Sequence, residues 1–180
     1  MTESLVLAAL RCAGIAVLLA LSVATAGAQT DELGEINKLI KASQFEQAAA
    51  RIDQALTGKP KDAQLRFLKG VVLTDLKKSP EAVDVFLQLS GDFPELPEPY
   101  NNLAVIYASQ GQYAKARAAL DMAIKVAPSW GTAHENLGDV YVMLAEQSYD
   151  KAVQLEPHNT AAARKLSLSR DLAGHAAVKH

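Results

Sequence analysis

Beyond residue 30, apolar residues recur three and four positions apart, which is the spacing of helices with one apolar face. Tyr100, Leu103 and Tyr107 form one such stripe and predict a helix. Gly111 follows it and permits a left-handed turn, and Pro128 closes a second apolar stretch because proline cannot continue a helix. The pattern therefore predicts two helices joined by a tight turn.

The same unit recurs along the chain with an interval of 34 residues. Four columns share this interval: the prolines Pro60, Pro94 and Pro128; the alanines Ala48, Ala82 and Ala116; the larger residues Leu39, Leu73, Tyr107 and Tyr141; and the small residues Gly70, Ala104 and Gly138. Ala104 and Ala116 are small where two helices must approach closely, so a leucine there would overpack by roughly 1–3 kcal/mol. A single helical pair leaves one apolar face uncovered, so the copies are expected to stack.

The period and the residue types resemble the tetratricopeptide repeat, a helix–turn–helix unit of this length. The resemblance covers about residues 31–157. It implies an all-α fold, a right-handed α-solenoid of helical hairpins. We expect a repeat domain over residues 29–157, with repeats at about 31–62, 63–96 and 97–130, a partial repeat at 131–157, and a capping helix and tail at 158–180.

The fourth copy is too short for a hairpin. Pro157 follows Pro128 by 29 residues, and residues 139–156 contain no Gly, Pro or Asn that would make a turn. One helical phase continues through the segment, which predicts a single fused helix over about residues 132–155. A tight kink near residues 145–148 is the alternative.

Several residues are typical of helix boundaries. Asn159 or Thr160 is expected to cap the terminal helix, and Gly174 to stop it. In the second repeat, Ser79 is expected to cap the helix in which Pro80 takes an early position.

The segment from Gly91 to Tyr100 has three prolines within six residues. It suits either a docking segment for an aromatic-lined partner groove or a stiff loop between repeats. We favour the loop, with Pro99 starting the next helix.

The resemblance implies that the first helix of each repeat lines a concave binding wall. On the matching positions, the wall residues are Asn37, Lys41, Phe67, Val71, Asn101, Asn102, Val105, Asn136 and Asp139, together with Gln64, Thr74, Glu98, Ala108, His134 and Glu135. In many members of the family an asparagine in the column of Asn102 and Asn136 holds the backbone of a bound peptide. An amide suits that role because it both donates and accepts hydrogen bonds.

The charge of this wall narrows the expected partner. Only Lys41 is a basic residue of the kind with which some relatives hold a terminal carboxylate, so an acidic tail is disfavoured. The formal net charge of the chain is −2, which is too neutral for a sequence-independent nucleic-acid binder. We expect a protein or peptide partner, and neither a nucleic acid nor a small-molecule substrate.

Candidate chemistry is weak throughout the sequence. The four histidines lack the spacing of a metal site, and there is no Gly-x-Ser-x-Gly elbow or Gly-rich phosphate loop. We therefore expect no metal, no cofactor and no enzymatic activity.

Residues 1–28 resemble a secretory signal peptide, with an apolar core over residues 13–26 and cleavage after Ala28. The sequence thus predicts a protein-interaction adaptor or scaffold of the bacterial cell envelope, periplasmic or secreted. Two alternatives stay open. One is an adaptor tethered to the membrane by an uncleaved leader, and the other is a structural protein that associates with itself.

Overall fold

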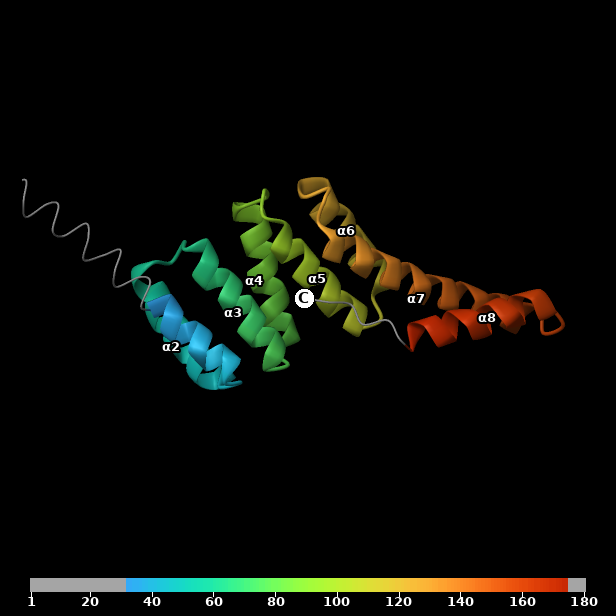
Figure 1. Ribbon diagram of the computed structural model, residues 1–180, viewed down its shortest axis with the longest axis horizontal. Coiled ribbons are helices and arrows are strands. Elements are labelled where there is room, and N and C mark those ends of the chain that lie inside the picture. The colour runs from blue at the N-terminus through green and yellow to red at the C-terminus, as the bar shows by residue number, and fades with distance from the viewer. Residues whose placement is uncertain (1–31, 175–180) are drawn as a thin grey trace, which may run out of the picture. The chain divides into compact units, whose positions relative to one another are not determined.

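The computed structural model describes residues 32–174, which divide after Pro60 into two compact units that are considered separately. The first holds a helix over residues 32–41 and α2 (Phe45–Gly58). The second holds α3 (Ala63–Asp75), α4 (Ser79–Asp92), α5 (Pro97–Ser109), α6 (Tyr113–Val126), α7 (Gly131–Leu155) and α8 (Thr160–Ala173) (Figure 1). All regular elements of the described part are helices, which confirms the predicted all-α fold class.

The helix boundaries repeat with the period of the sequence. The helices α2, α4 and α6 begin at residues 45, 79 and 113, and α3, α5 and α7 begin at 63, 97 and 131. In each repeat a proline follows the end of the second helix, two residues after Gly58, Asp92 and Val126. Within the second unit, α3 pairs with α4 and α5 pairs with α6, and α4 also packs on α5, as expected for stacked hairpins.

The turns inside the three full repeats share one backbone geometry. Their left-handed residues are Ser43, Lys77 and Gly111, with φ of 56°, 61° and 71°. Gln112 follows Gly111, and its N–H donates to the carbonyl of Tyr107 at 2.8 Å while its own carbonyl accepts from Ala116 at 3.0 Å. The expected left-handed turn at Gly111 is confirmed, and serine and lysine adopt the same conformation in the other two repeats at a cost that glycine avoids.

Two expected helix starts are wrong by one or two residues. Ser79 is the first residue of α4 and does not cap it; Lys78 precedes the helix, without a side-chain cap. The turn geometry fixes this start through backbone bonds, whatever side chain stands there. Likewise α5 begins at Pro97 instead of Pro99, since a proline also fits the first position of a helix.

The terminal helix begins and ends as expected. The side chain of Asn159 accepts from the N–H of Ala162 at 2.9 Å, and Gly174 follows the last residue of α8.

The small-residue column explains how closely the helices pack in the second repeat. A Cβ atom on Gly70 of α3 would lie 2.5 Å from the ring of Phe86 on α4, closer than real contacts allow. Phe86 is fully buried, and Phe67 packs beside it with the ring centroids 5.9 Å apart. Glycine at position 70 therefore makes room for the largest fully buried side chain of the described core.

The fourth copy forms one continuous helix of 25 residues, α7, so the predicted fusion is confirmed and the kink alternative is wrong. The first half of α7 packs on α6 and contacts α5, and α8 pairs with α7 (Figure 1). Arg170 of α8 joins the second half of α7 through Glu146 at 3.4 Å and Asp150 at 2.9 Å. These ion pairs are exposed and contribute little, so apolar contacts hold the pair of helices together.

Candidate functional site

The expected wall residues are distributed over both units. Asn37 and Lys41 are exposed in the first unit. The other seven lie on α3, α5 and the first half of α7, which belong to the second unit, and the candidate wall consists of these three helices. Phe67, Val71 and Val105 are half-buried there, as an apolar strip that still faces solvent would be.

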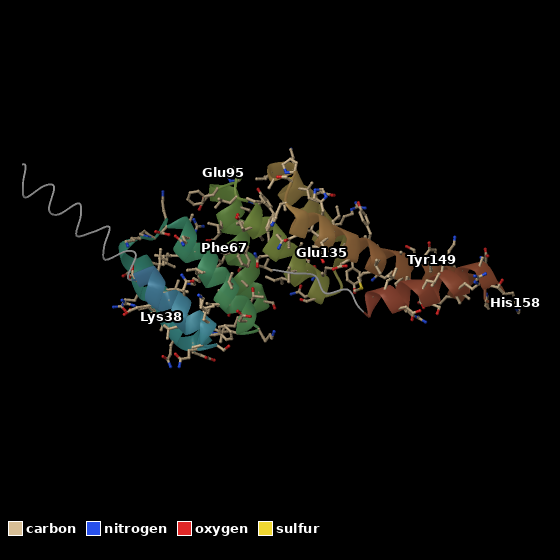
Figure 2. The ribbon with its side chains drawn as sticks, viewed as in Figure 1. Lys38, Phe67, Glu95, Glu135, Tyr149 and His158 are labelled. Carbon is tan, nitrogen blue, oxygen red and sulfur yellow. The ribbon has the colours of Figure 1, made fainter. Side chains whose placement is uncertain are left out.

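A hollow lies where α3 and α5 begin. It is lined by Ala63, Gln64, Phe67, Leu96, Glu98 and Pro99, and its lining is mostly apolar. Figure 2 shows Phe67 on α3, where its contact with Phe86 holds the ring in position. Hollows with apolar walls and one charged group at the edge suit the side chain of a bound peptide.

The proline-rich segment contributes to this hollow, a role that the sequence pattern did not indicate. Leu96 precedes α5 and Pro99 is buried in its first turn, so both are positioned by the start of that helix. The signal was present in the sequence as the run of prolines, which favoured a stiff loop. The segment does lie between two repeats, and two of its residues also line the candidate site.

Three asparagines of the wall were expected to expose their side chains to a bound partner, and the structure buries them instead. Asn101, Asn102 and Asn136 are only 1%, 6% and 0% exposed. The side-chain nitrogen of Asn136 on α7 donates to the side-chain oxygen of Asn101 on α5 at 2.8 Å. This bond joins the first helices of the third and fourth repeats, and it explains the burial because a buried amide requires a partner.

Asn102 has a local partner instead. Its side-chain nitrogen donates to the carbonyl of Glu98 at 2.9 Å, one turn earlier on α5. The shared column of Asn102 and Asn136 therefore holds two different arrangements, one within a helix and one between helices. The role of these residues in peptide binding stays a prediction.

The edge of the wall is acidic. Glu98 and Glu135 are exposed on α5 and α7, and Asp139 is half-buried one turn after Glu135 (Figure 2 labels Glu135). The basic Arg66 of α3 is mostly buried and pairs with Asp92 at 2.6 Å, so it serves the packing of α3 on α4. The ring nitrogen of His134 lies 2.9 Å from the carbonyl oxygen of Pro128, which places this side chain at the start of α7.

Metal binding and membrane insertion are two other ways in which residues 32–174 could act. Within that range, no three His, Cys, Asp or Glu side chains converge as a metal site would require. The same range contains no helix with the length and hydropathy of a membrane span. The leader and its expected cleavage site lie outside the described residues.

Family models match more than half of the chain. Two models described as tetratricopeptide repeat match residues 33–97 and 97–129, adjoining segments. A curated relative, the chloroplastic tetratricopeptide repeat domain-containing protein PYG7 of Arabidopsis thaliana, is 27% identical over 146 residues. That alignment covers 76% of this chain and 48% of the relative, so the chain spans about half the length of the curated protein it matches.

Solved structures show the same fold. The structure of MamA protein aligns with a TM-score of 0.58 at 19% identity and covers 81% of this chain and 82% of its own. The structure of YrrB, described as a TPR protein with an unusual peptide-binding site, aligns with a TM-score of 0.53 at 18% identity. It covers 74% of this chain and 71% of its own. At such identities the similarity establishes the fold alone.

Proposed function

Because the chain belongs to the tetratricopeptide repeat family, whose members generally act as protein-interaction modules, we propose that it is a non-catalytic adaptor or scaffold. It binds a peptide segment or a partner helix along the wall of α3, α5 and the first half of α7. The observation that carries this proposal is the apolar hollow beside Phe67, at the open edge of the wall. The peptide-binding site described for YrrB supports the same use of the fold.

The hollow defines the chemistry of the partner. Phe67, Leu96 and Pro99 would receive an apolar side chain, whose burial contributes about 1.5–3 kcal/mol for a residue the size of leucine. Glu98 at the edge favours a basic residue next to that apolar anchor. A partner segment with an apolar anchor and a neighbouring Lys or Arg therefore fits better than an acidic tail.

The location of the protein is the second part of the proposal. The apolar core and small residues of segment 1–28 support export to the bacterial cell envelope, where the adaptor would work in the periplasm or be secreted. Amino-terminal sequencing of the protein from the cell tests this part. A mature chain that begins at Gln29 supports export, and a retained leader favours the membrane-tethered form.

Partner capture by cross-linking tests the wall. In the full chain, Glu98→Lys reverses the charge at the hollow and Phe67→Ala removes its apolar side. Glu81→Lys, an exposed residue of α4 away from the wall, is the matched control for charge. We expect Glu98→Lys and Phe67→Ala to lose partners that Glu81→Lys retains, and capture unchanged by both wall variants would contradict the proposal.

A further inference from the structure

The first half of α7 exposes a surface that the complete repeats cover. Ala104 of α5 is fully buried and Tyr107 is partly buried against the core that α5 shares with α6. The same columns of α7 hold Gly138 and Tyr141. A Cβ on Gly138 would meet no atom within 4 Å, and Tyr141 is 51% exposed. These are the residues of a first helix that has no second helix against it.

The second half of α7 exposes the complementary surface. Pro157 follows the second half of α7 as Pro128 follows α6, and the two prolines are 29 residues apart. When α6 is aligned with the second half of α7 by this interval, the aligned residues are of similar type. The fully buried Ala116, Leu120 and Ala123 of α6 correspond to Ala145, Tyr149 and Ala152 of α7, which are only partly buried. These are the residues of a second helix that lacks its first helix.

One copy of the chain cannot bring these two surfaces together. Gly138 and Tyr149 lie about 16 Å apart along a straight helix that rises about 1.5 Å per residue. The helix has no turn between them, because the five residues that correspond to 108–112 of the third repeat are missing. The helix α7 thus carries both surfaces of a hairpin contact, but within one chain these two surfaces cannot touch.

We propose that a second copy of this chain supplies the missing half, with the two α7 helices packed antiparallel. Each copy then completes the fourth repeat of the other. This is an isologous contact, in which the same surface serves both partners. The inference does not rest on the hollow at Phe67 proposed above, because none of the residues that line that hollow belongs to α7.

Two contacts inside the complete hairpins set the register. The ammonium of Lys115 lies 5.4 Å from the ring centre of Tyr107, and Phe86 lies against Gly70. In the alignment of the repeats with α7, Tyr107 and Lys115 correspond to Tyr141 and residue 144. Gly70 and Phe86 correspond to Gly138 and Tyr149. The same contacts between two copies would therefore place Tyr141 opposite residue 144 of the second copy, and Gly138 opposite its Tyr149. Both pairs are centred within one residue of position 143, the midpoint of α7, so the two helices would overlap along their whole length.

The contact surface has suitable composition. The stripe from His134 to Ala152 that would face the second copy consists of His134, Gly138, Tyr141, Ala145, Ser148, Tyr149 and Ala152, and it contains no carboxylate, Lys or Arg. Like charges would therefore not meet across the twofold axis.

A hollow next to this stripe would receive the first half of the second α7. It lies between α7 and α8 and is almost wholly apolar, lined by Val142, Ala145, Tyr149, Lys165, Leu168, Ser169 and Leu172 (Figure 2 labels Tyr149). Leu168 and Leu172 are 62% and 60% exposed on α8. In the complete repeats, the first helix packs into the position that this hollow occupies, so its apolar lining fits the proposed occupant.

Light scattering and sedimentation of the full chain over a wide range of concentration test the proposal. We expect a dimer, and Tyr141→Glu is expected to raise its dissociation constant roughly ten- to hundredfold by placing two carboxylates beside the axis. Gln147→Glu is the matched control: it adds the same charge to α7 at an exposed position whose counterpart in α6, Ala118, is also exposed. Circular dichroism shows whether each variant retains its helices.

A second variant restores the hairpin within one chain. Inserting a copy of residues 108–112 between Tyr141 and Val142 returns the missing turn, and we expect a stable monomer because each chain then covers its own surface. A wild-type chain that stays monomeric would overturn the inference. So would a dimer that survives both Tyr141→Glu and the insertion, since its contact must then lie elsewhere.

Paired cysteines test the register. Cys12 is the single cysteine of the sequence and is first replaced by serine. In that Cys12→Ser background, Gly138→Cys with Tyr149→Cys should give a covalent dimer on oxidation, because the two positions are too far apart to bridge within one helix. Replacing Tyr149→Cys by Gln147→Cys should abolish the cross-link. Equal cross-linking of both combinations would contradict the antiparallel register.

Discussion

The third repeat and α7 share the pattern of small and large residues on their helices, but α7 lacks the five residues that make the turn of the third repeat. In the third repeat, Gly111 reverses the chain and α6 covers α5, so that Ala104 and Leu120 are fully buried. In α7 the matching residues Gly138 and Tyr149 stand on one straight helix and remain partly or fully open. Residues with high helix propensity on both sides of a deleted turn join into one helix, because nothing in the backbone then stops it. The comparison shows that the turn, more than the apolar pattern, decides whether the second helix of a repeat packs on the first and buries its apolar face.

The largest difference is expected at the column of Leu120. Leu120→Ala leaves a cavity in a fully packed hairpin and should cost about 2–5 kcal/mol of unfolding free energy. Tyr149→Ala removes a partly exposed side chain and should cost less than about 2 kcal/mol. Both are measured by urea denaturation in the Tyr141→Glu background, so that self-association does not contribute. Equal losses would mean that α8 alone covers Tyr149 as fully as two helices cover Leu120.

The small-residue column should respond with opposite signs. Gly70→Ala brings a Cβ against the ring of Phe86 and should lower the free energy of unfolding by about 1–3 kcal/mol. Gly138→Ala meets open space within one chain and improves helix propensity, so in the Tyr141→Glu background, where self-association does not contribute, it should raise stability by about 0.5–1 kcal/mol. Thermal denaturation followed by circular dichroism distinguishes the two, and a loss at Gly138 would show that this face is already closely packed.

The two asparagines of one column should also differ. Asn136→Ala leaves the buried side-chain oxygen of Asn101 without this donor and should cost about 1–3 kcal/mol. Asn102→Ala removes a bond within a single helix and should cost about 0.5–1.5 kcal/mol. Denaturation of both variants gives the comparison. Hydrogen exchange at the start of α7 should rise only for Asn136→Ala, because its bond joins α7 to α5, whereas the bond of Asn102 stays within α5.

The smallest effect is expected at the turns. Lys77→Gly relieves a left-handed backbone position and should raise stability by up to about 1 kcal/mol. Gly111→Ala creates the same strain and should lower stability by a similar amount. Denaturant midpoints measured in parallel check both signs. A loss at Lys77→Gly would mean that the lysine side chain itself supports the turn.

The repeat period let the sequence predict much of this fold. Columns of small and large residues report directly on helix packing, which is why the hairpins and the fused α7 were predicted correctly. The left-handed positions at Ser43 and Lys77 were not evident from residue type, because neither residue favours that conformation. Their place became clear only through the interval that they share with Gly111.

The candidate site was less predictable because it depends on contacts between repeats. The bond from Asn136 to Asn101 joins residues 35 apart, one more than the period, so no column contains both. The hollow combines Phe67 with Leu96 and Pro99, and the position of those two residues follows from where α5 begins. A shift of one residue in the start of a helix changes which side chains line the hollow. The pattern of polar and apolar residues does not fix a helix start that closely.

The unbroken course of α7 also has a mechanical consequence. Its backbone hydrogen bonds run from Gly131 to Leu155 over a length of about 37 Å, at 1.5 Å per residue. Under tension, helices joined by turns can move relative to one another at each turn. A continuous helix has no such turn, so it transmits the force from one end to the other. A pull applied at α8 would therefore reach α5 and α6 through a stiff lever arm.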